Sequence, residues 1–491
     1  MRSGLSAVAI LVASCLLVSA QRPRPPIAPP APVGAVPSAR QLAWHERQFY
    51  GFIHFTVNTF TDKEWGYGDE PESVFNPTAL DARQWAQVAR DAGMKGLIIT
   101  AKHHDGFALW PSRFTGHSVK GSPWKDGKGD VVGDLARACR EYGLALGVYL
   151  SPWDRNHAEY GRPAYLEYYR NQLRELLTNY GPVSEVWFDG ANGGDGYYGG
   201  ARERRRIDGA TYYDWPNTWK LVRELQPQAV MFSDVGPDVR WVGNEKGIAF
   251  ETSWNPINLE GLYPGHPKYT QVAAGRPDGA DWVPPEVDVS IRPGWFYHPA
   301  EDAKVASVDK LVEIYEQSIG RGANLLINIP PDRRGLIPDV DAQRLREFGQ
   351  RIAATYKTDL ARKATARAVH MRGSSARFSA ARVNDGDPNT YWATDDGVSS
   401  GTLDLEWARP VRLDRLVIQE AIQLGQRVES WTVEAEIDGR WTPIAHGTTI
   451  GYKRIATFQP VTTTRVRLAI GQARACPAIS TVGAYLSPGM K

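Results

Sequence analysis

Cysteine is scarce in this sequence, whose 491 residues contain three: Cys15, Cys139 and Cys476. The first lies in an N-terminal leader, and we expect the other two to fall in different domains. This distribution argues against a disulfide framework. We interpret Cys139 and Cys476 as buried, small apolar side chains in a core that holds without covalent cross-links.

An excess of charge of one sign is also lacking. Lys and Arg together number 57 and Asp and Glu 55, which leaves a formal net charge of +2. Proteins that bind nucleic acid or acidic membrane surfaces usually carry a clear basic excess. We therefore expect no nucleic-acid partner.

Long hydrophobic runs are confined to the N-terminus. Leu5–Val18 is apolar but too short for a good membrane span, and it lies between Arg2 and the small residues Val18-Ser19-Ala20. Residues 1–20 are therefore interpreted as a signal peptide, and the protein as exported to the periplasm or the medium. A lipoprotein anchor at Cys15 is less favoured, because apolar residues continue beyond it.

Two folded regions are predicted after a proline-rich linker at 21–40. Between 41 and 357, short apolar strands alternate with amphipathic helices, which is typical of parallel βαβ units. About eight strands over roughly 300 residues fit an α/β fold of the (β/α)8 barrel type. An open doubly wound sheet is the alternative, but no glycine-rich phosphate loop follows the first strand. The expected strands are 51–60, 96–101, 144–150, 183–188, 229–233, 247–251, 287–291 and 325–329.

The pattern changes near residue 358. Leu403, Leu405 and Trp407 alternate with polar residues, and the same period of two recurs along 431–437 and 466–470. Period-two segments joined by short turns indicate an antiparallel β-sandwich of the jelly-roll kind. Residues 358–491 are therefore expected to form a second domain.

The active site of a β/α barrel lies at the carboxyl ends of its strands. Those positions here hold carboxylates, histidines and tryptophans, a mixture that suits a sugar and a pair of carboxyl groups that cleaves its glycosidic bond. His103-His104 could instead bind a metal, but neighbours on a strand face opposite ways and no further ligand completes a set. Trp187 could be plain core, and Asp189 could be a capping residue.

Several segments carry a resemblance to a known family. They are His54-Phe55-Thr56, Glu64-Trp65-Gly66, Lys102 to Phe107, Tyr149 to Trp153 and Val186 to Gly190. In this order they resemble the signature segments of the α-L-fucosidases of glycoside hydrolase family 29. The resemblance implies a retaining mechanism with Asp189 as nucleophile and no required cofactor or catalytic metal. It also implies a set of substrate-binding residues: His54, Glu64, Trp65, His103, His104, Tyr149 and Trp187.

The acid/base residue is less clear from sequence. The segment from Val239 to Glu245 resembles the one that carries the acid/base in the branch specific for α-1,3/1,4-linked fucose, which favours Glu245. Glu251, at the end of the next expected strand, is the rival. The segment from Arg292 to His298 then makes Trp295 a substrate-site residue. We expect 240–247 and 292–298 to border the leaving-group side.

The second domain resembles discoidin-like, galactose-binding-like sandwiches through Val383 to Trp392. Such a loop often holds a structural Ca²⁺ in that family, although its Asp and Asn residues suit a plain turn equally well.

The sequence thus predicts an exported exo-α-L-fucosidase acting on fucosylated oligosaccharides or glycoprotein glycans with α-1,3/1,4 linkages. The alternatives are a broad-specificity fucosidase, another barrel glycosidase such as a galactosidase, and a sugar-binding protein without turnover.

Overall fold

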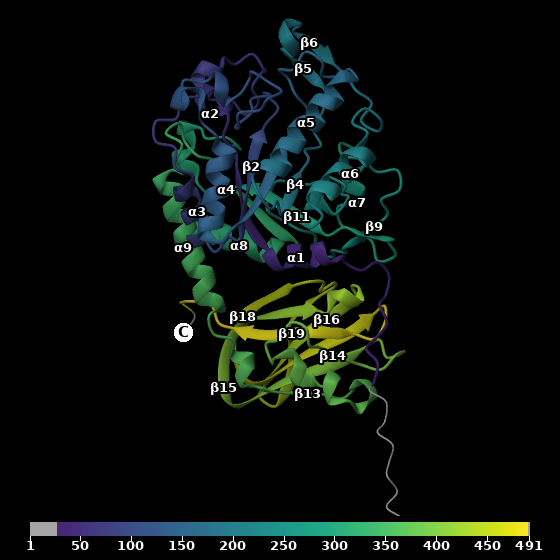
Figure 1. Cartoon of the computed structure of the whole chain (residues 1–491). Coiled ribbons are helices and arrows are strands. Elements are labelled where there is room, and N and C mark those ends of the chain that lie inside the picture. The colour runs from purple at the N-terminus through teal and green to yellow at the C-terminus, as the bar shows by residue number, and fades with distance from the viewer. Residues whose placement is uncertain (1–26, 490–491) are drawn as a thin grey trace, which may run out of the picture.

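The computed structural model describes residues 27–489, so the predicted signal peptide and the first part of the linker lie outside the described residues. The chain forms a β/α barrel that sits on an antiparallel β-sandwich (Figure 1). No helix within 27–489 has the length and apolar character needed to cross a membrane.

Eight parallel strands close the barrel in the order β1-β12-β11-β8-β7-β4-β3-β2. The predicted (β/α)8 fold is therefore confirmed. Apolar side chains such as Phe52, Ile98 and Leu326 fill its interior, and a larger cluster packs between the strands and the surrounding helices. The barrel strands are β1 (Phe49–Ile53), β2 (Gly96–Lys102), β3 (Ala145–Leu150), β4 (Glu185–Trp187), β7 (Val230–Ser233), β8 (Val239–Trp241), β11 (Pro285–Ser290) and β12 (Asn324–Asn328).

The predicted sixth strand at 247–251 is wrong. The sixth barrel strand is β8, which pairs with β7 and β11 directly after a short turn. Residues 247–251 form no strand, and the backbone N–H of Ala249 donates to the carbonyl of Gln317, at the end of helix α8, at 2.9 Å. The run 248–250 is apolar in sequence like a strand, but of its three residues only Ala249 is buried, beside α8, and Phe250 is 42% exposed.

Polar residues stop and start the barrel helices as the sequence pattern predicts. The Asp81 side chain accepts from the N–H of Arg83, and Ser307 caps α8 by accepting from the N–H of Lys310. Helix α4 ends at Gly143, whose φ of +69° suits a residue without a side chain. The helices are α1 (Ala39–Arg47), α2 (Val57–Thr61), α3 (Ala82–Asp91), α4 (Val131–Tyr142), α5 (Ala164–Asn179), α6 (Trp215–Leu225), α7 (Tyr269–Val272), α8 (Val308–Ser318) and α9 (Asp339–Tyr356).

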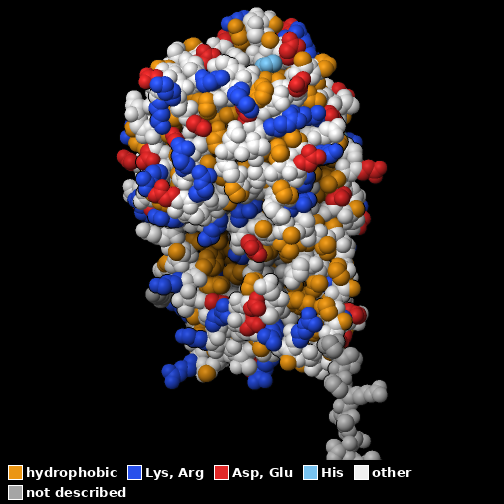
Figure 2. All heavy atoms as spheres, in the orientation of Figure 1, with side chains coloured by type: hydrophobic (Ala, Val, Ile, Leu, Met, Phe, Trp, Pro, Cys, Tyr) orange, Lys and Arg blue, Asp and Glu red, His pale blue; other side chains and the backbone are white. Residues whose placement is uncertain are grey.

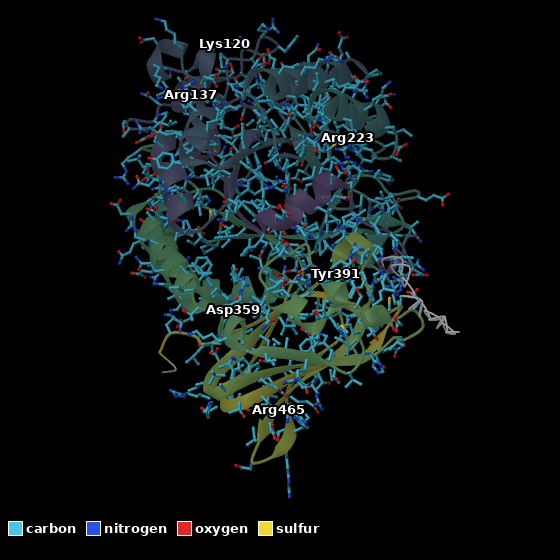
Figure 3. The ribbon with its side chains drawn as sticks, turned by 60° about the horizontal axis from the view of Figure 1, so that its bottom comes forward. Lys120, Arg137, Arg223, Asp359, Tyr391 and Arg465 are labelled. Atoms are coloured by element: carbon cyan, nitrogen blue, oxygen red, sulfur yellow. The ribbon has the colours of Figure 1, made fainter. Side chains whose placement is uncertain are left out.

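The sandwich follows α9. Asp359 marks the junction: its carboxylate accepts from the N–H groups of Ala361 and Ala484 at 2.9 Å each (Figure 3). Long strands β15 and β18 pair along most of their length and bury alternate residues, including Leu403 and Leu405. The strands are β13 (Thr365–Ala368), β14 (Trp392–Ala393), β15 (Gly401–Glu420), β16 (Val428–Ile437), β17 (Arg440–Gly447), β18 (Arg454–Ala473) and β19 (Ala478–Tyr485).

The sandwich packs against the amino ends of the barrel strands. Lys453 hydrogen-bonds Gln48, which directly precedes β1. The backbone of Arg321, just before β12, forms an isolated antiparallel β-bridge with the backbone of Arg454. The described part of the linker runs along the sandwich, where the N–H of Val33 donates to the carbonyl of Leu424 at 3.0 Å. The site is predicted at the carboxyl ends of the strands, which lie at the opposite end of the barrel. The sandwich therefore packs against the end of the barrel that is remote from the predicted site.

Cys139 and Cys476 are buried, and within residues 27–489 both are unpaired. In the loop resembling a calcium site, Asp385 accepts from the N–H of Asp387 and from the hydroxyl of Thr390. No group of three or more His, Cys, Asp or Glu suited to a metal occurs in the described part of the chain. Calcium at this loop stays a prediction. Charges of both signs are interspersed over the face in Figure 2.

Candidate active site

Two adjoining hollows open at the carboxyl ends of the barrel strands. The first, of about 190 Å³, and the second, of about 280 Å³, share Trp187, Asp189, Ala191, Glu245 and Asp288. The first is otherwise lined by Phe52, His54, Glu64, Trp65, His103, His104, Tyr149 and Trp295. The second is otherwise lined by Gly190, Phe232, Asp234, Trp241, Gly265, His266, Pro267 and Tyr269.

The first hollow brings together every residue that the sequence assigned to substrate binding, with Asp189 and Glu245 beside them. Glu251 does not join them. Its carboxylate pairs with Arg454 at 3.1 Å and with Arg321 at 3.2 Å, where barrel and sandwich meet. The prediction of Glu251 as rival acid/base relied on a strand that does not form, so the geometry favours Glu245.

Asp189 follows β4, and two donors hold its carboxylate. The hydroxyl of Tyr149 donates to Oδ2 at 3.0 Å, and the N–H of Ala191 donates to Oδ1 at 2.7 Å. The side chain keeps 26% of its surface exposed, so it is fixed in place yet open to a ligand. Two hydrogen bonds of this kind fix the orientation of the carboxylate.

The three histidines that line the first hollow, His54, His103 and His104, are neutral. Burial lowers the pKa of His54 to about 3 and that of His104 to about 4, and it places that of His103 well below its usual range. His54 Nδ1 lies 2.8 Å from Asn328 Oδ1, and His104 Nδ1 lies 2.7 Å from the hydroxyl of Ser151.

These contacts also assign the tautomers. The amide nitrogen of Asn328 donates elsewhere, to Ser290 and Trp295, and the hydroxyl of Ser151 donates to the carbonyl of Trp153. Both histidines must therefore donate from Nδ1, which leaves each Nε2 as an acceptor. Nε2 of His104 lies 3.8 Å from Asp189 Oδ2, a spacing too long for a direct hydrogen bond.

Aromatic rings form the floor of the first hollow. Trp187 stacks on Phe232 with ring centroids 4.1 Å apart and on Tyr149 at 5.4 Å, and it contacts Phe52 at 5.2 Å. Its indole N–H donates to Glu286 at 2.9 Å, which fixes the ring orientation. The ring is thus held firmly in place, and the 7% of Trp187 that stays exposed lines both hollows.

Glu64 joins two loops at the rim. It accepts from the N–H groups of Trp295 at 2.9 Å and Phe296 at 3.1 Å, and it contacts His298 Nε2 at 2.6 Å. Trp295 in turn lies 5.2 Å from the ring of His54. Glu64 therefore positions the segment after β11, and contact with a substrate hydroxyl stays a prediction.

Glu245 lies at the edge of both hollows, on the loop after β8. Its pKa is raised, chiefly by partial burial and also by the negative charges of Asp189 and Glu64, although a hydrogen bond with Trp295 opposes the shift. A carboxyl group with a raised pKa can hold the proton that a departing oxygen needs.

The two segments expected at the leaving-group side, 240–247 and 292–298, differ in where their side chains lie. Trp241 and Glu245 line the second hollow, whereas Arg240 is buried beneath it and bonds backbone carbonyls, including that of Trp254 at 2.7 Å. Arg292 is likewise buried, against Asp341. Residues 265–269 line the second hollow, whereas Trp295 of 292–298 lines the first.

No pattern in the sequence indicates that 265–269 line the site, because most of this segment is a loop without strand or helix periodicity. Asp288 was not predicted from the sequence either, although a local pattern indicates it. In Glu286-Val287-Asp288-Val289 the two carboxylates alternate with valines, so both carboxylates point to the same face of the strand.

Comparison with known proteins supports this picture. The α-L-fucosidase family matches residues 33–355, and the F5/8 type C domain family matches 363–480. Alpha-L-fucosidase 1 of Arabidopsis thaliana is 44% identical over 465 residues, covering 93% of this chain and 88% of that protein.

Solved structures agree. A glycoside hydrolase 29 family member from an unknown rumen bacterium is 45% identical with a TM-score of 0.83, covering 94% of this chain and 79% of the other. A GH29 fucosidase of Ruminococcus gnavus in complex with fucose is 31% identical with a TM-score of 0.84, covering 95% and 98%. This chain therefore belongs to the α-L-fucosidase family, glycoside hydrolase family 29, and carries a C-terminal F5/8 type C domain.

Proposed function

We propose that the protein is an exported, retaining exo-α-L-fucosidase that removes terminal α-1,3/1,4-linked fucose from glycans. The observation that carries the proposal is the first hollow, which gathers a fixed carboxylate, a carboxyl group with a raised pKa, neutral histidines and an aromatic floor. Its volume of about 190 Å³ suits one monosaccharide rather than a chain of sugars.

In the first step, Asp189 attacks the anomeric carbon of fucose while Glu245 gives its proton to the departing glycosidic oxygen. The bond to the leaving sugar breaks as the ester bond to Asp189 forms. In the second step, Glu245 takes a proton from water, whose oxygen displaces Asp189 from the same carbon. Two inversions at one carbon give net retention.

The remaining residues bind the sugar in this scheme. His54 and His104 each present an acceptor nitrogen to hydroxyl groups, as their assigned tautomers require. Trp187, Phe52 and Trp295 offer apolar surface to the methyl group and ring of fucose. An apolar wall favours fucose over galactose, because galactose carries a 6-hydroxyl that such a wall leaves without a partner.

The second hollow supports the restricted linkage. It adjoins Asp189 and Glu245 and offers the stacked rings of Trp241 and Tyr269, 5.3 Å apart, with His266 and Asp234 beside them. A leaving sugar held there contributes binding energy to the transition state, so substrates that lack it lose kcat/KM. Its presence beside the carboxylates favours this reading over a broad-specificity enzyme.

The test compares kcat/KM on three substrates and identifies the anomer of fucose that is released first. We expect kcat/KM to be highest for Lewis-type trisaccharides, lower for an aryl α-L-fucoside and lowest for α-1,2-fucosyllactose. The fucose first released, followed by proton NMR, should be the α-anomer. Comparable values on all three substrates would refute the linkage. First formation of the β-anomer would refute retention, and failure to release fucose from any of them would leave a sugar-binding protein.

A further inference from the structure

We propose that Asp288 acts as a neutral carboxylic acid, which fixes Trp241 through Oδ1 and donates a hydrogen bond from Oδ2 to the leaving sugar. The inference rests on the proposed function, since it concerns how that substrate is held. It assigns a role to a third carboxyl group of the site, beside Asp189 and Glu245.

The backbone aims Asp288 into the barrel. In β11 it pairs with Leu326 of β12, whose side chain belongs to the barrel interior, while the neighbouring Val287 and Val289 pack outside the barrel. The side chain is buried, with 4% of its surface exposed, yet it lines both hollows. A ligand that spans the two hollows must therefore pass it.

The two oxygens of Asp288 have different surroundings. Oδ1 accepts from the indole N–H of Trp241, and within the described residues this is the only hydrogen bond that another residue makes to the carboxyl group. Oδ2 is left for a ligand. Because an indole N–H can only donate, Oδ1 takes the carbonyl role, and the proton of a neutral acid is carried by Oδ2.

The charges around Asp288 favour the neutral form. The side chains that most affect its ionisation are Glu245, Glu286 and Trp241, and none of them is a cation. Burial and the negative charges of the two glutamates place the pKa of Asp288 well above its usual range. A buried carboxylate without a cation is costly, and protonation removes that cost. The other titratable groups that line its hollows are Asp189, Glu64, Asp234, His54, His103, His104, His266, Tyr149 and Tyr269.

The position of Trp241 indicates which sugar receives the bond. Trp241 lines the second hollow and not the first, and it stacks on Tyr269. A carboxyl group fixed to Trp241 therefore faces the leaving sugar, beside Glu245. A donor that binds a hydroxyl group of the leaving sugar here keeps the glycosidic oxygen near the proton that Glu245 gives it.

Two variants test the proposal. Asp288→Asn keeps the shape, an acceptor toward Trp241 and a donor in place of Oδ2–H, so kcat/KM should stay within about threefold of the wild type. Asp288→Ala removes both contacts and should lower kcat/KM about 10- to 100-fold on the best oligosaccharide substrate. An aryl fucoside, which has no hydroxyl groups in the second hollow, should lose much less.

The pH profile separates a neutral from an ionised Asp288. If Asp288 is neutral, Asp288→Asn leaves the charge near Glu245 unchanged, and the alkaline limb of kcat/KM stays in place. If Asp288 is ionised, the substitution removes a negative charge, lowers the pKa of Glu245 and moves that limb to lower pH. A shift of the alkaline limb to lower pH in Asp288→Asn would overturn the proposal. So would a kcat/KM of Asp288→Asn as low as that of Asp288→Ala.

Trp241→Phe provides the matched control, because it removes the indole donor and keeps a ring. Asp288→Ala should cost more than Trp241→Phe on the oligosaccharide, and equal losses would reduce Asp288 to a support for the ring. An infrared difference spectrum of wild type minus Asp288→Asn at neutral pH should contain a protonated-carboxyl band, and its absence would refute the neutral form. That readout needs no activity, so it remains decisive if no fucose is released.

Discussion

The hydroxyl of Tyr149 donates to Oδ2 of Asp189 at 3.0 Å across the floor of the first hollow. Tyr149 is the last residue but one of β3, and parallel pairing of β3 with β4, the strand that precedes Asp189, places Tyr149 opposite Trp187. The bond therefore follows from barrel register, and it holds the carboxylate of Asp189, the proposed nucleophile, at a defined place in the first hollow.

Tyr149→Phe removes this bond and little else. A hydrogen bond to a charged group contributes about 1.5–3 kcal/mol, so kcat/KM should fall roughly 10- to 100-fold. Tyr169→Phe is the matched control, because it deletes a buried hydroxyl that donates to the carbonyl of Leu150 at 3.0 Å, away from the hollow. Equal kinetic effects of the two variants would contradict a specific role for Tyr149.

Asp189→Gly should fold normally and lose cleavage by several orders of magnitude, because a covalent nucleophile has no substitute in the site. Azide, small enough for the vacated space, should restore part of the turnover and form β-fucosyl azide. Turnover near that of the wild type in a folded Asp189→Gly protein, judged by circular dichroism, is the contrary result.

Glu245→Ala should slow substrates with poor leaving groups far more than an activated dinitrophenyl fucoside, whose leaving group departs without a proton. Glu251→Ala removes the same side chain from outside the hollows and should leave the leaving-group dependence unchanged. Equal losses on both substrate classes in Glu245→Ala would move the acid/base role to another residue.

The pH dependence follows from the raised pKa of Glu245. The first step needs its protonated form, so kcat/KM should fall as the pH rises through that pKa, at a pH above the usual range of a glutamate. His54 and His104, with pKa values of about 3 and 4, stay neutral and contribute no inflection between pH 5 and 8. A profile controlled by a group with the pKa of an ordinary histidine, unchanged in Glu245→Gln, would contradict this assignment.

Tyr269→Ala opens one wall of the second hollow and leaves the first intact. Loss of a stacked aromatic surface of this kind lowers binding by about 1–3 kcal/mol, so kcat/KM on a Lewis trisaccharide should fall about 5- to 100-fold. An aryl fucoside serves as the internal control and should change little. The same loss on both substrates would place Tyr269 outside the leaving-group site.

Strand periodicity predicted most of the barrel, because buried parallel strands such as Gly96–Lys102 are continuous apolar runs between amphipathic helices. It failed at 247–251, where Ala249 is buried beside α8 but Phe250 is exposed, and it missed the three-residue strand β8, whose polar Arg240 conceals its place in the sheet. Such short strands are specified by their neighbours rather than by their own sequence.

The first hollow could be predicted because its residues follow strands in recognisable segments. The second could not, since residues 265–269 lie in a loop whose place depends on tertiary contacts, such as that between Gly265 N–H and Asp234 at 3.0 Å. The ion pair of Glu251 with Arg454 of the sandwich joins residues that are 203 positions apart in the chain, and no local pattern indicates it.

The most direct test of the account is covalent trapping of the nucleophile. A 2-deoxy-2-fluoro-fucosyl fluoride forms the glycosyl-enzyme readily and releases it slowly, so peptide mass spectrometry can locate the ester. The account predicts one fluorofucosyl group on the peptide that contains Asp189, and none in Asp189→Gly. A label on another carboxylate, or hydrolysis of the reagent with inversion and no label, would contradict it.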